Sequence, residues 1–388
     1  MLDFVHDINT KVLFGKGCIE KLPEELAPLG RRVLLAYGGG SIKRTGLYDT
    51  IMKLLSDGGF EVTELSGIEP NPRIGSVREG VKLCRERGIE AVLAVGGGSV
   101  IDCAKAVACG VFFEGDPWDM IRTSRRRMKA LPLAAVLTLS ATGSEFDDSG
   151  VISNLETHEK LGAILTPPAV SFCDPTYTFT VSKYQTASGS ADILSHIFEG
   201  YFSRTDDSDV FDGLAETVMK TVIKYTPTAL DEPENYSARA NLMVCSSIGC
   251  SGIPEYGKRG TGWPCHAMEH ELSAYYDITH GVGLAILTPR WMRHILKKDP
   301  TVTPRFARFA RNVFGITEGS EAELAEKGID AIDAFLRSVG LPTCLSELGI
   351  GEEHFEAMAE HANRGGRLER AYVPLTKEDV IGIFRACL

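Results

Sequence analysis

The chain has 388 residues, 44% of them hydrophobic and 24% charged, a composition typical of globular proteins. Its 52 acidic residues outnumber the 41 basic ones, which gives a formal net charge of −11. Because an acidic surface repels phosphate backbones and anionic lipids, these numbers argue against a nucleic-acid-binding or membrane-surface protein. The one dense basic run, Arg125 to Arg127 with Lys129, is too short to form a binding face.

The N-terminal residues lack the charged and apolar regions of a signal peptide. No apolar run reaches the roughly 18–20 residues that a membrane-spanning helix needs. The ten cysteines are scattered and form no C-x-x-C pair. In a chain without an export signal, such cysteines are typical of reduced thiols rather than a disulfide framework. We therefore expect a cytoplasmic protein.

The first half of the chain alternates short apolar runs with amphipathic stretches. The runs predict strands at 32–37, 60–65, 91–95 and 133–137, and the stretches predict helices at 47–57, 74–87 and 100–107. Runs rich in Val, Ile and Leu without alternation are typical of strands buried on both faces, so we predict a mostly parallel sheet. The alternation of strands with helices predicts a doubly wound α/β domain.

The pattern changes near residue 180, beyond which strand signals are absent. Ser182 and Gln185 fit a capping box that opens a helix ending near Tyr201. Further helices are predicted at 209–225, 237–247, 267–276, 303–313, 321–339, 352–361 and 377–385. The sequence thus predicts an α/β dinucleotide-binding domain over residues 1–180 and an all-helical domain over residues 181–388.

A glycine-rich loop, Gly96 to Ser99, joins the strand at 91–95 to the next helix and is followed by Asp102 and Lys105. Glycines let the backbone approach a ligand closely, and the amides at a helix N-terminus bind phosphate. The loop matches neither the G-x-G-x-x-G fingerprint nor a Walker A loop. A phosphate site and a plain strand–helix turn therefore both remain open at this point.

A second glycine stretch, Gly38 to Gly40, follows the strand at 32–37. In NAD sites an acidic residue at such a strand end commonly binds the adenosine ribose hydroxyls. This chain has glycines there, followed by Ser41, Lys43 and Arg44. The missing carboxylate removes a repulsion, and these side chains offer donors to a 2′-phosphate. The stretch favours NADP over NAD, with a solvated turn as the competing interpretation.

Imidazole and carboxylate groups occur at metal-ligand spacing on two predicted helices. Asp192 and His196 lie four residues apart and so share one helix face. His266 and His270 share a face in the same way and His280 follows, so three of the nine histidines fall within fifteen residues. One carboxylate with imidazoles suits Fe(II) or Zn(II), and room for a substrate oxygen would make the site catalytic.

The same residues allow a different interpretation. His266, Glu269 and His270 match the H-x-x-E-H pattern of metallohydrolases, in which the glutamate is the base. A hydrolase would leave the glycine stretches, Asp192 and His280 without a role. We therefore keep it as the less favoured alternative.

Taken together, these stretches resemble the iron-containing (group III) alcohol dehydrogenase family, and within it the butanol dehydrogenase and NADPH-dependent aldehyde reductase branch. The matching motifs, in family order, are Tyr37–Arg44, Gly96–Lys105, Leu137–Glu145, Glu159–Gly162, Asp192–His196 and His266–His280. The ordered set is far more specific than any one motif. One departure is Ser140, where relatives often have proline or threonine.

The resemblance implies a Rossmann-like parallel-sheet nucleotide domain and a C-terminal helical metal-binding domain with a cleft between them, as in dehydroquinate synthase. It implies a metal-dependent oxidoreductase that transfers a hydride between NADP(H) and a primary alcohol or aldehyde, such as butanol or butanal. A glycerol dehydrogenase-like or dehydroquinate synthase-like enzyme on the same fold is the alternative. The family also implies a homodimer.

The resemblance further assigns roles to single residues. The metal, Fe(II) or Zn(II), would be bound by Asp192, His196, His266 and His280, and His270 would be a catalytic histidine on the substrate side. Gly39 would stand where NAD-dependent relatives have an aspartate. The cofactor would contact Gly38, Gly39, Gly40, Ser41, Lys43, Gly96, Gly97, Gly98, Ser99, Asp102, Thr138, Thr142 and Lys160, with Lys160 near the nicotinamide ribose.

Overall fold

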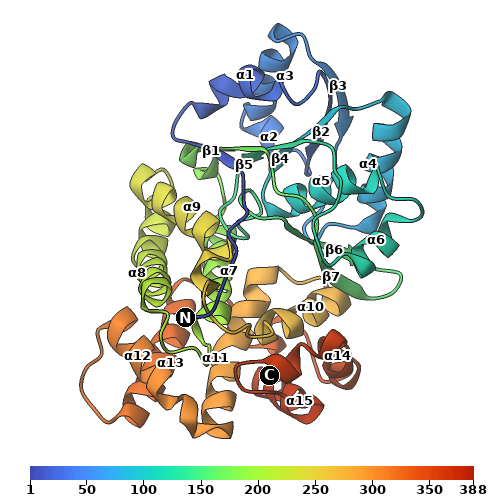
Figure 1. The fold of residues 1–388 in the computed structure, drawn as a ribbon. Coiled ribbons are helices and arrows are strands. Elements are labelled where there is room, and N and C mark those ends of the chain that lie inside the picture. The colour runs from blue at the N-terminus through green and yellow to red at the C-terminus, as the bar shows by residue number, and fades with distance from the viewer. The chain divides into compact units, whose positions relative to one another are not determined.

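The structure is a computed structural model that describes all residues from 1 to 388 (Figure 1). The chain divides into two compact units. The sheet unit comprises residues 7–181 and 233–251, and the helical unit comprises residues 1–6, 182–232 and 252–388. The predicted division of the chain at residue 180 stays a prediction about its domains.

Six parallel strands form the sheet of the sheet unit, in the order β1-β8-β5-β4-β2-β3. Their bounds are β1 Lys11–Phe14, β2 Arg32–Tyr37, β3 Glu61–Leu65, β4 Ala91–Gly96, β5 Leu133–Leu137 and β8 Val170–Cys173. Every residue of β4 and β5 is buried, because the central strands are covered on both faces. The predicted parallel sheet is confirmed.

The helices of this unit pack on both faces of the sheet. Val33 of β2 belongs to one apolar core with α1 and α3, and Leu34, which points the other way, belongs to a second core with α4 and α5. The helices are α1 Leu22–Leu26, α2 Ser41–Arg44, α3 Leu47–Asp57, α4 Ile74–Arg87, α5 Gly98–Gly110, α6 Pro117–Thr123 and α9 Tyr236–Cys250.

Helix α9 comes from the second half of the chain but belongs to the sheet unit. Its Ser246 hydroxyl accepts the Gly143 backbone N–H at 3.2 Å, and its Ser247 hydroxyl donates to Glu145 Oε1 at 2.6 Å. These contacts tie α9 to the loop that follows β5.

Four strands of the sheet unit were not predicted. They are β1, β8 and the antiparallel hairpin of β6 Ser149–Asn154 with β7 Glu159–Ile164. Both β1 and β8 are four residues long, too short to show a period in the sequence, and β1 is an edge strand with exposed side chains. Their existence depends on pairing with each other and, for β8, with β5.

The helical unit contains no strand, and no strand follows Cys173 in the whole chain, which confirms the all-helical prediction for residues 181–388. Ser182 caps the first helix by accepting the Gln185 backbone N–H at 3.2 Å. The helices are α7 Lys183–Tyr201, α8 Asp209–Asp231, α10 Pro264–Tyr276, α11 His280–Lys298, α12 Thr303–Phe314, α13 Glu321–Ser338, α14 Phe355–Ala362 and α15 Lys377–Ala386.

Helix α11 was not predicted, because Gly281, Gly283 and Pro289 are signals of a loop. In the structure Gly281 lies inside a helix, where it permits close packing. A Cβ atom at this position would lie 2.1 Å from the carbonyl oxygen of Ser188 in α7. The glycine therefore permits α7 and α11 to approach closely, at the point where His280 begins α11.

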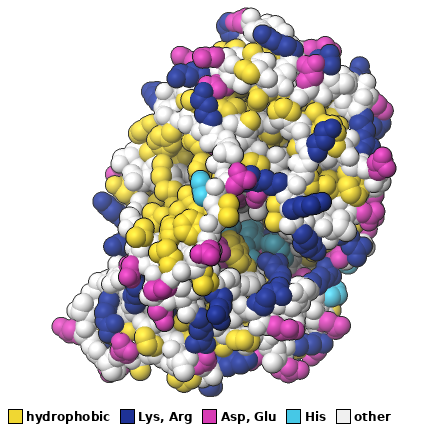
Figure 2. All heavy atoms as spheres, in the orientation of Figure 1, with side chains coloured by type: hydrophobic (Ala, Val, Ile, Leu, Met, Phe, Trp, Pro, Cys, Tyr) yellow, Lys and Arg dark blue, Asp and Glu magenta, His cyan; other side chains and the backbone are white.

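Acidic and basic side chains are interspersed over the face of the molecule drawn in Figure 2. In the basic run, Arg127 is paired, since its guanidinium donates to Asp148 at 2.6 Å and to Asp7 at 3.1 Å. None of the helices combines the length and the apolar character that a membrane-spanning segment requires. The cytoplasmic localisation stays a prediction.

Candidate active site

Helix α7 carries the first two residues of the histidine cluster. His196 Nδ1 lies 2.8 Å from the carbonyl oxygen of Asp192 and 3.2 Å from its carboxylate oxygen Oδ1. A carbonyl oxygen only accepts hydrogen bonds, so Nδ1 carries the proton and the lone pair of a neutral His196 ring is on Nε2. This local arrangement follows from the spacing of four residues on one helix.

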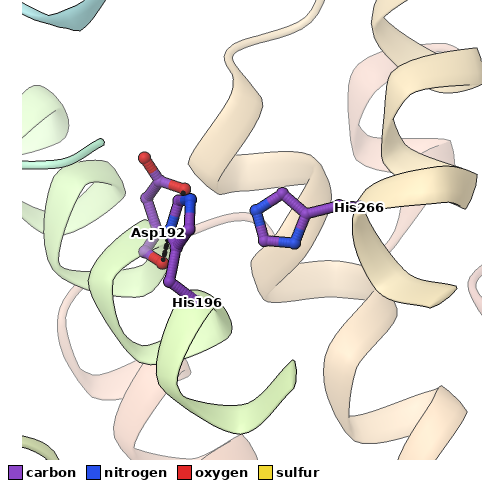
Figure 3. A group of neighbouring side chains, drawn as sticks. All are labelled: Asp192, His196 and His266. Carbon is purple, nitrogen blue, oxygen red and sulfur yellow. Dashed lines mark hydrogen bonds and ion pairs between the residues drawn. The ribbon is translucent and has the colours of Figure 1, made fainter. Parts of the chain in front are cut away.

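Helix α10 contributes His266, whose ring centroid lies 4.5 Å from that of His196 (Figure 3). Donor atoms of Asp192, His196 and His266 all lie within 4.8 Å of one another, close enough to share one metal ion. His266 Nε2 is buried without a hydrogen-bond partner. Because a buried, unsatisfied nitrogen is costly, a cation bound there would stabilise the arrangement, and the residues fit a metal site.

His280, the first residue of α11, joins this cluster. Its Nε2 lies 3.6 Å from Asp192 Oδ1, and its ring centroid lies 5.3 Å from that of His266. The structure therefore brings together the four residues that the resemblance named as ligands. His270, one turn after His266, has its ring centroid 5.7 Å from that of His280 and groups with Glu269 and His280.

Two buried glutamates contact ring nitrogens of the cluster. Glu199 Oε1 accepts the backbone N–H of His266 at 2.9 Å and lies 3.2 Å from its Nδ1. Glu269 contacts Nδ1 of His280 with one oxygen and accepts the Ser273 hydroxyl with the other. Glu199 was not predicted, although its place three residues after His196 puts it on the same face of α7. Glu269 was predicted only as the base of a hydrolase.

Burial dominates the protonation of these groups. It lowers the pKa of His266 well below its usual range, and the nearby His196 and His280 act in the same direction. His266 is therefore neutral, which is the form that binds a metal. Burial also raises the pKa of Glu199 to about 8, against the opposing effect of the hydrogen bond from His266. A nearby cation would favour the ionised carboxylate.

In the sheet unit, the glycine loop between β4 and α5 is closely packed. Gly97 is the N-cap and α5 begins at Gly98, so the helix starts two residues earlier than predicted. The Val100 N–H donates to the Gly97 carbonyl at 3.0 Å, which leaves the amides of Gly98 and Ser99 without an acceptor inside the helix. A Cβ atom would lie 2.1 Å from Thr142 Oγ1 at Gly98 and 2.5 Å from a Val100 methyl at Gly96. Packing therefore requires glycine at both positions.

Asp102 and Lys105 are buried in α5 and bound within the sheet unit. Asp102 accepts the Ser144 hydroxyl at 2.5 Å with one oxygen and the Val151 backbone N–H at 2.8 Å with the other. Lys105 donates to Asp147 at 2.6 Å. Asp102 thus holds the loop after β5 and the β6–β7 hairpin, and its contact with a cofactor stays a prediction.

The stretch after β2 contains no carboxylate between Gly38 and Arg44. Gly40 has a φ of 99°, in the left-handed region that favours glycine, and it caps α2, which begins at Ser41. A Cβ atom at Gly39 would meet nothing within 4 Å. The end of β2 is therefore open at Gly39.

Lys43 of α2 lies over two aromatic rings beside this stretch. Its Nζ is 5.0 Å from the ring centroid of Tyr37 and 4.4 Å from that of Tyr48. Both tyrosine hydroxyls donate to Glu64 of β3, at 2.5 and 2.9 Å. The rings of Tyr37 and Tyr48 thus hold Lys43 near the end of β2, while their hydroxyls bind the Glu64 carboxylate.

Three further predicted cofactor residues also lie in the sheet unit. The Thr138 backbone N–H donates to the Gly96 carbonyl at 3.0 Å, which joins the ends of β4 and β5. Thr142 packs against Gly98, and Lys160 is buried on β7. Their contacts with a cofactor stay predictions.

A parallel sheet with a glycine loop at the start of a helix, in one chain with an Asp/His₃ cluster on helices, is the combination expected of a metal-dependent dehydrogenase. Family models match both parts of the chain. The iron-containing alcohol dehydrogenase model matches residues 9–175, and the C-terminal model of the Fe-containing alcohol dehydrogenase family matches residues 186–388. The chain belongs to the iron-containing alcohol dehydrogenase family.

Individual relatives agree with this assignment. The chain is 50% identical to NADH-dependent butanol dehydrogenase A of Clostridium acetobutylicum over 99% of both chains. It is 37% identical to the NADPH-dependent aldehyde reductase YqhD of Escherichia coli over 92% of both chains. A crystal structure of NADH-dependent butanol dehydrogenase A from Thermotoga maritima matches with a TM-score of 0.94 at 41% identity, covering 100% of this chain and 99% of that one.

The family assignment confirms the predicted resemblance and the two-part α/β and helical fold. The protein is an alcohol/aldehyde oxidoreductase, and its family is one that works with a nicotinamide cofactor and iron. The H-x-x-E-H hydrolase interpretation is wrong, because both halves of the chain match a dehydrogenase family. In the structure the glutamate of that pattern, Glu269, contacts His280 instead of standing free as a base.

Proposed function

We propose that this enzyme uses NADP(H) to interconvert small aldehydes and the corresponding primary alcohols, such as butanal and butanol. We further propose that it accepts a broad range of such substrates. The observation that carries this proposal is the convergence of Asp192 and His196 on the buried, unsatisfied Nε2 of His266. The names of the relatives, butanol dehydrogenases and an aldehyde reductase, support the substrate class.

Four residues would hold the metal ion: Asp192, His196, His266 and His280. One carboxylate with three imidazoles suits both Fe(II) and Zn(II), so either ion fits this donor set. When bound, the ion supplies a Lewis acid that polarises a carbonyl oxygen. Asp192 contributes the only carboxylate of this ligand set, and the neutral His266 contributes a lone pair without adding charge.

The remaining residues bind the cofactor and move a proton. The loop from Gly96 to Ser99 and the N-terminus of α5 bind the pyrophosphate, and Lys160 binds near the nicotinamide ribose. His270 holds a proton at a ring nitrogen and transfers it to the substrate oxygen during reduction. The residues that bind the hydride-donating cofactor thus belong to the sheet unit, whereas His270, the proton donor, belongs to the helical unit.

The preference for NADP(H) follows from the end of β2. A carboxylate there would repel the 2′-phosphate, whereas the open Gly39, the Ser41 hydroxyl and the Lys43 ammonium would accept it. The names of the relatives are divided, because the butanol dehydrogenases are called NADH-dependent and the aldehyde reductase NADPH-dependent. The preference therefore has to be measured on this chain.

The test is the oxidation of NADPH and, in parallel, of NADH with butanal, using protein reloaded with Fe(II) or with Zn(II). We expect metal-dependent turnover with kcat/KM at least about tenfold higher for NADPH than for NADH, the equivalent of about 1.4 kcal/mol. A preference for NADH would contradict the cofactor proposal alone. No turnover with either cofactor across several aldehydes, despite bound metal, would contradict the proposed reaction.

We also propose a homodimer, which is the expectation for this family. Sedimentation should then give about twice the mass of the 42.2 kDa chain. A monomer at micromolar concentration would contradict this expectation and leave the proposed reaction untouched.

A further inference from the structure

The three histidines of the proposed metal site share one feature, an acceptor at Nδ1. For His196 the acceptor is the backbone carbonyl of Asp192. For His266 it is the carboxylate of Glu199, and for His280 it is the carboxylate of Glu269. An acceptor at Nδ1 holds the proton on that atom, so the lone pair of each neutral ring lies on Nε2.

Glu199 lies on α7, the helix that also carries Asp192 and His196, and contacts His266. It is 2% exposed, and its Oε1 accepts the backbone N–H of His266 at 2.9 Å in addition to facing the ring. Two contacts to one residue fix both the start of α10 and the plane of the imidazole. Its other oxygen, Oε2, is buried without a hydrogen-bond partner. A buried carboxylate in this state is costly unless a cation is near, and the Arg367 guanidinium already favours the ionised form of Glu199.

Glu269 lies on α10 and has no exposed surface. The hydroxyl of Ser273, one turn later, donates to one of its oxygens and leaves the other for His280. Gly283 of α11 makes room for the side chain, since a Cβ atom there would lie 2.8 Å from Glu269 Cγ. Gly283, one of the residues that are typical of a loop in the sequence, thus gives the Glu269 carboxylate room to contact His280, the first residue of α11.

We propose that Glu199 and Glu269 are positioning residues of the metal site, each of which fixes the orientation and tautomer of one ligand histidine through Nδ1. This inference rests on the metal site proposed above. A carboxylate acceptor makes the imidazole a stronger ligand, because it draws the Nδ1 proton and raises the electron density at Nε2. The bound ion in turn stabilises the two buried negative charges.

Glu269 could alternatively be assigned as a ligand that itself binds a metal ion. Donor atoms of Glu269, His270 and His280 lie within 4.8 Å of one another. However, the carboxylate already contacts His280 Nδ1 and Ser273, so we assign it to the histidine. The two assignments differ in stoichiometry, because a second site would bind two ions per chain instead of one.

The test compares Glu199→Gln and Glu269→Gln with two control variants in the same unit. Glutamine keeps the shape and an acceptor oxygen but removes the charge. Glu271→Gln changes a buried acid of α10 that pairs with His361, and Glu216→Gln changes one of α8 that pairs with Arg308. Neither control residue belongs to the histidine cluster.

The readouts are the number of Co(II) or Zn(II) ions bound per chain, the Kd from competition with a chromophoric chelator, and the Co(II) absorption spectrum. We expect one ion per chain, Kd values about 10–100-fold higher in both test variants, and altered Co(II) bands. The controls should keep the parent spectrum and the parent Kd. A parent-like Kd and spectrum in both test variants would overturn the proposal, and two ions per chain would overturn the assignment of Glu269.

Thermal melting separates positioning from a purely structural role. A structural residue lowers Tm equally with and without Co(II), whereas a positioning residue reduces the rise in Tm that Co(II) produces. If Glu199→Gln does not fold, Glu199→Asp, which keeps the charge but shortens its reach, is measured in its place with the same expectation. Parent protein that binds no ion would instead contradict the proposed metal site, so the two failures are distinguishable.

Discussion

The backbone of Asp192 holds the ring of His196, since the carbonyl oxygen of the first lies 2.8 Å from Nδ1 of the second within α7. This contact depends on helical spacing and not on the aspartate side chain. The two roles of Asp192, a carbonyl that orients a ligand and a carboxylate that would itself bind the ion, are therefore separable by substitution.

Asp192→Asn should abolish tight metal binding while leaving His196 in place. The variant removes the only carboxylate among the four proposed ligands but keeps the backbone acceptor. We expect metal affinity to fall by at least about 100-fold, or about 2.7 kcal/mol, with far-ultraviolet circular dichroism unchanged. Metal content after dialysis, measured by mass spectrometry, checks this. Retention of one ion per chain with the parent affinity would show that the charge of Asp192 does not contribute to metal binding.

His270→Ala should slow turnover without loss of metal. A proton donor contributes about 10²–10⁴-fold to a rate, so we expect kcat for aldehyde reduction to fall within that range. The metal content should stay at the parent level, because His270 lies outside the proposed ligand set. If the metal is lost with the activity, His270 is a ligand instead.

Gly39→Asp should turn the cofactor preference toward NADH. The backbone at Gly39 is unstrained and a Cβ atom there meets nothing within 4 Å, so the fold should tolerate the change. The new carboxylate would repel a 2′-phosphate and could bind ribose hydroxyls, and we expect the NADPH to NADH ratio of kcat/KM to fall by at least about tenfold. Steady-state kinetics with both cofactors measure this ratio. An unchanged ratio would mean that Gly39 does not face the adenosine ribose.

Two glycine-to-alanine changes should have opposite effects on stability. Gly98→Ala places a methyl group 2.1 Å from Thr142 Oγ1, and overpacking of this kind costs about 1–3 kcal/mol. Gly382→Ala lies at an exposed position within α15 where a Cβ atom meets nothing, and it should stabilise the fold by about 0.5–1 kcal/mol. Urea unfolding of both variants checks the signs. A neutral Gly98→Ala would show that the loop relaxes around the methyl group.

Asp379 should make stability depend on pH in the acidic range. Burial opposes ionisation of this carboxyl, but hydrogen bonds from Lys298, the Thr376 backbone and His294 outweigh it and lower the pKa to about 2. Because the folded pKa lies below the ordinary value of 3.8, the carboxylate stabilises the fold above about pH 4 and loses this effect as the pH falls toward 2.

Asp379→Asn should therefore lower the free energy of unfolding by about 1 kcal/mol at pH 6, after allowance for solvent screening of a partly exposed group. At pH 3 the difference between the parent and the variant should be smaller. Urea unfolding at the two pH values measures it. A difference that is equal at both values would show that the charge of Asp379 is not the cause.

Local patterns in the sequence predicted much of the fold and of the site. Uninterrupted apolar runs indicated the central strands β2, β4 and β5, because strands covered on both faces need no polar side. The spacing of four residues placed Asp192 beside His196 and His266 beside His270, because such pairs share a face in any α-helix. Each of these predictions depends only on neighbours within one element.

The features that the sequence did not reveal depend on contacts between distant segments. Gly281 and Gly283 are typical of a loop when considered alone, but in the structure they allow α11 to pack closely against α7 and Glu269. The strands β1 and β8 form only because each pairs with another strand. Helix α9 joins the sheet unit through Ser246 and Ser247, which a local pattern could not show.

The sequence by itself therefore determined the residue types of the site, the helices that carry Asp192 and His266, and the absence of a carboxylate beside Gly39. Helix periodicity could not bring His280 to Asp192, a meeting that only the family resemblance had implied and that the tertiary structure decided. The contacts of Glu199 and Glu269 with histidines at Nδ1 were decided by the tertiary structure alone. The physical reason is that helix periodicity fixes which side chains share a face, whereas the distance between faces depends on how α7, α10 and α11 pack.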